Sequence, residues 1–241
     1  MAEDPELTII LPVYNEGPNI ERVLDGIAGT VRAERREVLV VYDFDEDDTV
    51  PVVRSLQGRM PDLRLHRNDI GRGVLNAIRA GLEAGRGPYL LVMMADGSDE
   101  PEVIDSMLER ARGGADVVAG SRYMKGGRQI GGPLLKSTLS RLAGLSLHWV
   151  GGMPIHDPTS NFKLYSRRLL DRVTIESVAG FELAIELTTK AYLLGLKIEE
   201  VPTTWRDRTA GASRFRIWSW LPHYLHWYLR ALSGRFRRSR P

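Results

Sequence analysis

The strongest constraint on the fold is an alternation of two apolar patterns along the first half of the chain. Short apolar runs rich in β-branched residues alternate with segments whose apolar residues recur at helical spacing. The runs predicted as strands are 7–13, 37–42, 63–66, 89–94 and 116–119. The segments predicted as helices are 20–27, 50–56, 73–83 and one that starts near Pro101. This order predicts right-handed crossovers and an α/β fold, in which a mostly parallel sheet carries helices on both faces.

The pattern changes after Gly120. A glycine-rich stretch follows at 126–133, which we expect to be either a simple surface connection or a flexible loop that closes over a ligand. Helical spacing returns at 134–148 and at 181–194, and a last strand is predicted at 197–201. With no internal repeat and no long linker in the sequence, we expect one main domain.

The chain contains no cysteine. This absence excludes disulfides, thiolate nucleophiles and zinc–thiolate sites, so chemistry must rest on carboxylates, hydroxyls, basic groups or a hard metal ion. Residues 1–6 are acidic and lead directly into the first predicted strand, without the basic and apolar segments of a signal peptide. We therefore expect a cytoplasmic protein, and 241 residues are enough for one large core.

Positive charge is concentrated near the end of the sequence. From Arg206 onward there are nine arginines and one aspartate, a net charge of +8, which leaves −6 for the rest of a chain whose total is +2. This segment is also aromatic, and it carries an apolar stripe at helical spacing, formed by Trp218, Leu221, Leu225, Leu229 and Leu232. No apolar run reaches the ~20 residues of a spanning helix. We expect a catalytic domain at 1–213 and, at 214–241, an amphipathic tail on a membrane surface, although packing on the core or binding to nucleic acid would also fit parts of this pattern.

Acidic residues follow three of the predicted strands. They are Glu16 after the first strand, Asp43 after the second, and Asp96 with Asp99 after the fourth. Any one of them could be an ordinary solvated turn residue. In open parallel sheets, however, ligands bind beyond the carboxyl ends of the strands. The shared position of these residues therefore predicts a ligand site at that edge of the sheet.

Several short motifs occur in a fixed order along nearly the whole chain. They are Pro12-Val13-Tyr14-Asn15-Glu16, Gly71-Arg72-Gly73, Gly120-Ser121-Arg122-Tyr123, Lys125-Gly126-Gly127-Arg128, Asp157-Pro158-Thr159-Ser160-Asn161-Phe162 and Gly211-Ala212-Ser213-Arg214-Phe215. In this combination the chain resembles the family 2 glycosyltransferases of the GT-A fold, and within them the dolichol- and polyprenyl-phosphate mannose synthases. The resemblance implies a Rossmann-like GT-A domain, a nucleotide-sugar donor and a lipid-phosphate acceptor.

The resemblance also implies a nucleotide pocket. Pro12, Tyr14, Glu16 and Asp43 would line it, and an acidic side chain there would accept a hydrogen bond from a base N–H. The loop at 42–45 reads Tyr-Asp-Phe-Asp, where two adjacent aspartates and a glycine are usual in the family. This difference leaves the base open between uridine and guanosine.

By the same resemblance, Asp96 would be the metal-binding carboxylate of an Asp-x-Asp motif and would also contact the nucleotide sugar. The first aspartate of the motif is replaced by Met94. We therefore expect Ser98 or Asp99 to supplement Asp96 in holding Mg²⁺ or Mn²⁺, with diphosphate oxygens completing the shell.

A phosphate acceptor is already anionic near pH 7, because its second pKa is about 6, so it requires cations more than a general base. Basic residues that follow the fifth strand are predicted to grip the phosphate: Arg122, Arg128, Lys136 and Arg141. Lys136 and Arg141 would equally fit the solvated face of a helix. The family places an acidic residue near the acceptor at Asp157, which could instead be a turn residue before proline. The predicted catalytic residues are Asp96, Arg122, Arg128 and Asp157.

Together these observations predict an inverting glycosyltransferase at the inner face of the membrane. It would move a sugar from GDP-mannose or a UDP-hexose to a polyprenyl or dolichyl phosphate, with Mg²⁺ or Mn²⁺ as cofactor and no nucleic acid as partner. Two alternatives stay open. One is a transferase of the same fold with a non-lipid acceptor, and the other is a catalytically weakened nucleotide-sugar-binding protein, suggested by Met94.

Overall fold

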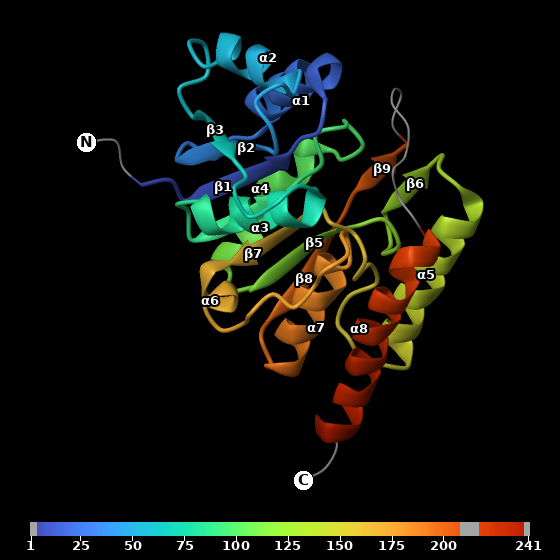
Figure 1. Ribbon diagram of the computed structural model, residues 1–241. Helices are drawn as coiled ribbons and strands as arrows, with labels where there is room; N and C mark the ends of the chain where they lie inside the picture. Colours follow the sequence, from blue (N-terminus) through green and yellow to red (C-terminus); the bar gives the residue numbers. More distant parts are fainter. Residues whose placement is uncertain (1–3, 208–216, 239–241) are drawn as a thin grey trace.

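The computed structural model describes residues 4–207 and 217–238, and its centre is a seven-stranded sheet (Figure 1). The strands in chain order are β1 (Leu7–Pro12), β2 (Arg36–Tyr42), β3 (Leu63–Arg67), β4 (Tyr89–Val92), β5 (Val117–Ser121), β7 (Lys163–Ser166) and β8 (Ile198–Pro202). They lie in the order β3-β2-β1-β4-β7-β5-β8. Within this sheet β7 runs antiparallel to its neighbours β4 and β5, and the other pairs are parallel. The prediction of a mostly parallel sheet is confirmed.

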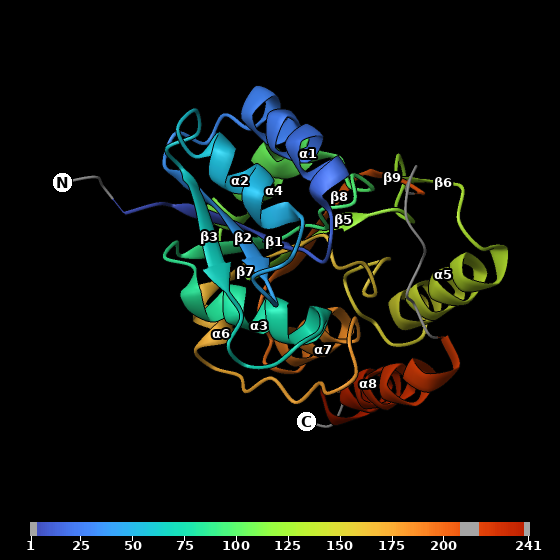
Figure 2. The ribbon, with the colours of Figure 1, turned by 45° about the horizontal axis from the view of Figure 1, so that its top comes forward.

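Helices cover both faces of the sheet, as the alternating pattern predicts. One face carries α1 (Gly17–Thr30), α2 (Thr49–Leu56), the 3-10 turn η1 (Pro101–Val103) and α4 (Ile104–Arg112). The other carries α3 (Val74–Ala84), α6 (Arg167–Leu170) and α7 (Leu183–Leu193) (Figures 1 and 2). The remaining helices, α5 (Leu134–Trp149) and α8 (Ile217–Arg238), lie side by side beyond this second group, and the hydroxyls of Ser146 and Tyr228 meet between them at 2.9 Å.

Two apolar cores, one on each face, explain why these segments adopt these elements. The strands are buried on both faces, so they appear in the sequence as nearly continuous apolar runs. On the first face, α1 buries Ile20 and Ile27 at helical spacing. On the second, Ile78 of α3 and Trp227 of α8 join one core. Each large apolar side chain buried in this way contributes roughly 2 kcal/mol to stability.

The C-terminal helix α8 is amphipathic in a way that the sequence pattern only partly predicts. Trp227 is 3% exposed and packs into the second core. Three leucines of the predicted stripe turn outward instead, since Leu221, Leu225 and Leu229 are 42%, 49% and 55% exposed, whereas Leu232 is partly buried against the second core. The predicted boundary after residue 213 and the motif at 211–215 lie outside the described residues. Among the described helices, none is long and apolar enough to cross a membrane.

The glycine-rich stretch after β5 forms part of a second, small sheet. Its strand β6 (Arg128–Ile130) pairs in parallel with β9 (Thr204–Arg206). β9 is tied in turn to the loop after β4, because Arg206 N donates to the Ser98 carbonyl oxygen at 3.0 Å. Backbone hydrogen bonds therefore hold this stretch against the domain. Its glycine content did not predict this pairing, because the partner strand lies far away in the sequence.

Candidate functional site

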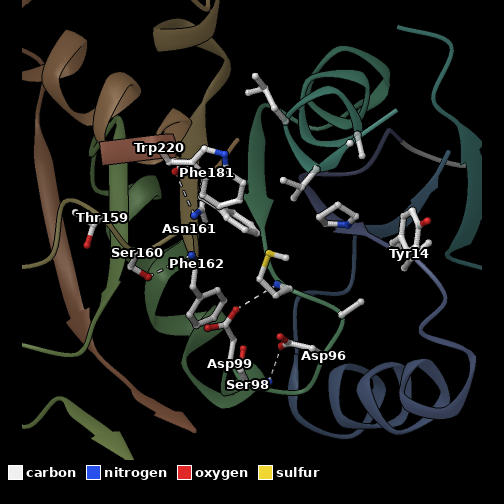
Figure 3. A pocket seen from close by; sticks show the side chains of 18 of the residues that line it. Tyr14, Asp96, Ser98, Asp99, Thr159, Ser160, Asn161, Phe162, Phe181 and Trp220 are labelled. Carbon is white, nitrogen blue, oxygen red and sulfur yellow. Dashed lines mark hydrogen bonds between the residues drawn. The ribbon is translucent and has the colours of Figure 1, made fainter. Parts of the chain in front are cut away.

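A cleft of about 730 Å³ opens beyond the carboxyl ends of β1, β2 and β4, where the acidic loops were predicted to meet. This is the size of a small-molecule binding site. Figure 3 shows Tyr14 at one side of the cleft, Asp96 and Asp99 in its lower middle, and Phe181 and Trp220 toward the other side. The cleft therefore brings together residues from both halves of the chain.

The loop after β1 brings three of the predicted nucleotide contacts, Pro12, Tyr14 and Glu16, to the wall of the cleft. The loop after β2 holds it in place, since Asn15 N donates to the carboxylate of Asp47 at 3.0 Å. Asp47 is buried and does not line the cleft. Asp47 therefore supports the loop after β1 and does not contact a ligand in the cleft directly.

Asp43 lines the cleft and joins the loop after β2 to the start of α3. Its two carboxylate oxygens accept hydrogen bonds from Asn68 Nδ2 and from Gly73 N, both at 2.7 Å. Because each oxygen has two lone pairs, the carboxylate can accept a further bond from a ligand N–H. Arg72 also lines the cleft, and the central carbon of its guanidinium lies 5.1 Å from the centre of the Phe44 ring. Asp43 and Arg72 therefore both line this end of the cleft.

Asp96 and Asp99 place two buried carboxylates in the loop after β4. Asp96 Oδ1 accepts from Ser98 N at 3.0 Å, and Asp99 Oδ2 accepts from Met94 N at 3.2 Å. Met94, which replaces the first aspartate of the Asp-x-Asp motif, thus holds the Asp99 carboxylate through its backbone N–H. Burial, and after it the charge of Asp96, raises the pKa of Asp99 to about 7.

This acidic pair suits a divalent cation, because a cation would relieve the repulsion that disfavours two ionised carboxylates. Within residues 4–207 and 217–238, no group of three His, Cys, Asp or Glu side chains could hold a metal ion. Asp96, with Asp99 or the Ser98 hydroxyl, could therefore hold such an ion together with oxygens of water or of a substrate.

Arg122 and Asp157 form a buried ion pair next to the acidic loop. Arg122 Nε lies 2.7 Å from Asp157 Oδ2, and Nη2 lies 2.9 Å from Oδ1. Asp157 is fully buried and does not line the cleft, whereas Arg122 does. Burial alone would raise the pKa of Asp157, but the charge and hydrogen bonds of Arg122 outweigh it and hold that pKa below its ordinary value. Asp157 therefore stays ionised and orients the guanidinium.

The guanidinium of Arg122 connects the acidic loop to α5. Its Nη2 lies 3.3 Å from the Ser140 hydroxyl of α5, and its charge acts on Asp99. Among the described residues, no hydrogen-bond acceptor contacts its Nη1. Because Arg122 also lines the cleft, its guanidinium could bind an anion there.

The end of the cleft beyond Arg122 is apolar. Its large and small apolar residues come from α5, from the 178–181 loop and from α8: Leu139, Ala143, Val178, Phe181, Trp220 and Leu221. The rings of Phe181 and Trp220 meet edge to face with their centres 5.4 Å apart. These residues were missed in the sequence because no local motif links three segments so far apart. One cleft thus joins a polar end to an apolar end.

Three of the predicted phosphate contacts are not placed in the cleft. Arg128 in β6 and Arg141 on α5 are exposed and do not line it. The exposure of Arg141 fits the alternative of a solvated helix face. The side chain of Lys136 lies outside the described part of the chain. A role for these three residues stays a prediction.

Fold, acidic loop and cleft define the class as that of the GT-A glycosyltransferases. The model of glycosyl transferase family 2 matches residues 8–174, so the chain belongs to this family and is a glycosyltransferase. The resemblance seen in the motifs is thereby confirmed.

Two relatives narrow the comparison. The chain is 32% identical over 213 residues to the polyprenol monophosphomannose synthase of Mycolicibacterium smegmatis. The aligned region covers 86% of this chain and 79% of the relative. The chain is also 29% identical over 227 residues to a dolichol-phosphate mannosyltransferase of Pyrococcus furiosus. Here the aligned region covers 90% of this chain and 62% of the relative.

A solved structure supports the fold. A mannosyltransferase from Pyrobaculum calidifontis, in complex with GDP-Man and Mn²⁺, is similar with a TM-score of 0.64 at 21% identity, covering 98% of this chain and 64% of that one. This chain thus spans less than two thirds of the Pyrococcus and Pyrobaculum proteins.

Proposed function

We propose that this glycosyltransferase transfers a sugar from a nucleotide sugar to a polyprenyl phosphate at a membrane surface. The observation that carries the proposal is the single cleft with two unlike ends and Arg122 where they meet. A nucleoside diphosphate suits the polar end, and an acceptor with an anionic head and an apolar chain suits Arg122 and the apolar end. The names of the two relatives support this acceptor class, and they support mannose as the sugar.

At the polar end, Asp43 would accept a hydrogen bond from the base, and Pro12, Tyr14 and Glu16 would enclose the nucleotide. Asp96, with Asp99 or Ser98, would hold Mg²⁺ or Mn²⁺ against the diphosphate. The Mn²⁺ bound by the Pyrobaculum protein supports a divalent ion of this kind. When bound, the ion supplies positive charge for the diphosphate leaving group.

At the junction, the outer edge of Arg122 would bind the acceptor phosphate while Asp157 keeps the guanidinium oriented. The phosphate is anionic near neutral pH and is itself the nucleophile, so no general base is required. Its oxygen forms a bond to the anomeric carbon as the bond from that carbon to the diphosphate breaks. This single displacement inverts the anomeric configuration.

Exposed apolar side chains on two helices support a membrane location. On α5, Leu134, Leu142 and Trp149 are 83%, 60% and 73% exposed, and the outward leucines of α8 lie on the neighbouring helix. Large apolar residues gathered on one side of a protein mark an interaction surface. We propose that α5 and α8 lie in the headgroup region on the inner face of the membrane, so that the acceptor chain stays in lipid.

A matrix of donors and acceptors tests the proposal. Purified protein receives UDP- and GDP-linked hexoses with Mg²⁺ or Mn²⁺ and one of three acceptors: polyprenyl phosphate, the matching polyprenol, or soluble sugars and sugar phosphates. We expect transfer to polyprenyl phosphate alone, and none after chelation of the metal. Equal transfer to a soluble acceptor would favour the alternative of a transferase with a non-lipid acceptor. Nucleotide binding without any transfer would favour the weakened binding protein.

A further inference from the structure

A buried lysine lies directly behind the loop that carries Asp157. Lys163 is the first residue of β7, between β4 and β5 in the middle of the sheet, and its side chain is fully buried. Its Nζ donates to the carbonyl oxygens of Asp157 at 3.3 Å and of Pro158 at 3.0 Å, and also to that of Ser160. The three protons of the ammonium group therefore have three acceptors on one short loop.

Lysine and loop satisfy each other. Residues 157–160 form neither helix nor strand, so their carbonyl groups lack the N–H partners that regular structure supplies. The buried ammonium group of Lys163 is also unfavourable unless polar groups surround it. Burial lowers the pKa of Lys163 to about 7, while the nearby charges of Asp157 and Glu200 raise it and that of Arg122 lowers it. Only the protonated amine can donate all three bonds.

The other side of the same loop faces the cleft. The Asp157 carboxylate holds the Arg122 guanidinium by two hydrogen bonds and also accepts from Ser160 N at 3.2 Å. Thr159 and Ser160 line the cleft, as Figure 3 shows. One ammonium group thus fixes the inner side of a loop whose outer side orients the guanidinium.

We propose that Lys163 is a positioning residue for the acceptor phosphate. It fixes the 157–160 loop and, through Asp157, sets the place of the Arg122 guanidinium. The inference rests on the proposed function, because it takes Arg122 as the group that binds the phosphate. Lys163 does not line the cleft and has no catalytic contact of its own.

Lys163→Met keeps the length of the side chain and removes the three donors. A shift of the guanidinium should raise the KM for polyprenyl phosphate by about tenfold or more, while the Kd for nucleotide stays within about twofold. Glu37→Gln is the matched control. Glu37 is 1% exposed and accepts bonds from the Thr8 hydroxyl, at 2.8 Å, and from Arg86 N, at 2.6 Å, but it lies near the start of β2, which does not neighbour β7. Glu37→Gln should lower the stability of the protein without raising the KM for polyprenyl phosphate relative to the Kd for nucleotide.

Amide hydrogen exchange provides a readout that does not need turnover. Arg122 N and Ser160 N both donate to Asp157 at 3.2 Å. Lys163→Met should speed exchange at both amides by about tenfold or more, and Glu37→Gln should not. If Lys163→Met does not fold, Lys163→Gln, which keeps part of the donor capacity, takes its place in the same comparison.

Two results would overturn the inference. One is an acceptor KM and amide exchange in Lys163→Met that match those of the wild type. The other is a rise in acceptor KM and nucleotide Kd together, as in a general loss of structure. If the wild type does not glycosylate polyprenyl phosphate at all, the proposed function fails, and the exchange rates then test the ordering of the loop separately.

Discussion

Arg122 and Asp157 bury opposite charges against each other, so each depends on its partner. Removing the arginine leaves a carboxylate that is 0% exposed without its cation. We expect Arg122→Ala to lower the free energy of unfolding by about 3 kcal/mol, and the double variant with Asp157→Ala to lose less than the sum of the two single changes. Urea unfolding of the four proteins measures this, and purely additive losses would contradict the pairing.

The Arg122–Asp157 pair also makes the free energy of unfolding depend on pH. The pKa of Asp157 lies below its ordinary value of 3.8 in the folded protein, so the unfolded chain binds more protons in acid. The stabilisation is complete above about pH 4 and is lost as the pH falls through the lower folded value. We therefore expect the free energy of unfolding to fall below about pH 4, and to fall less steeply in Asp157→Asn. Equal pH slopes from denaturant unfolding of the two proteins would contradict this.

Single residues show what the sequence could predict of the site. Tyr14, Asp43 and Asp96 reach the cleft because parallel strands bring their carboxyl ends to one edge, which the strand pattern already implies. Arg128 was chosen for its charge and its loop, and neither of these determines where a side chain points. Lys163 gave no signal, because its acceptors are backbone carbonyl groups that fold against it.

Among the elements, α8 presents two faces with different tasks. Trp227 belongs to the core, whereas Leu221, Leu225 and Leu229 are exposed. Changing these three leucines to serine should lower binding to anionic phospholipid vesicles by about tenfold or more, because each loses apolar surface that the bilayer would bury. The thermal unfolding temperature should change little.

Leu194→Ser is the control for this change, since Leu194 is similarly exposed, at 42%, after the end of α7. It should leave vesicle binding intact in a sedimentation assay. Undiminished binding of the triple variant would contradict an interfacial role for α8.

Helix α5 packs so closely on the loop before β7 that only glycine fits at position 144. A Cβ atom there would lie 2.1 Å from the carbonyl oxygen of His156. Gly144→Ala should therefore cost about 1–3 kcal/mol of unfolding free energy and lower the melting temperature. Gly29→Ala on α1, where nothing lies within 4 Å, should be neutral or stabilising by up to about 1 kcal/mol. Equal melting temperatures for the two variants would contradict this packing.

The elements that the sequence missed share a physical cause. β7 starts with a lysine and pairs antiparallel between two parallel strands, so neither its composition nor its direction follows from the alternating pattern. β6 and β9 have three residues each and are partly polar. Strands this short are formed by their partners more than by local preference.

In the whole molecule, the cleft lies where loops from both halves of the chain converge. The polar end was predictable, since loops after β1, β2 and β4 supply it in chain order. The apolar end was not, because Leu139, Phe181 and Trp220 come from separate elements that meet only after folding. The mostly parallel sheet and the family were therefore accessible from the sequence, whereas the position of the apolar end depends on the structure.

We propose that a sugar passes within this one cleft from a nucleotide to a lipid phosphate. The most direct test gives the protein a GDP- or UDP-linked sugar labelled in the hexose, together with polyprenyl phosphate, and follows the label into the lipid phase. We predict one labelled lipid product, formed in step with nucleoside diphosphate release. Asp96→Ala should slow its formation by about 100-fold or more, whereas Asp25→Asn, on the exposed side of α1, should not. Label that stays in the aqueous phase would exclude transfer to the lipid phosphate, and a lipid product formed equally well by Asp96→Ala would exclude a role for Asp96.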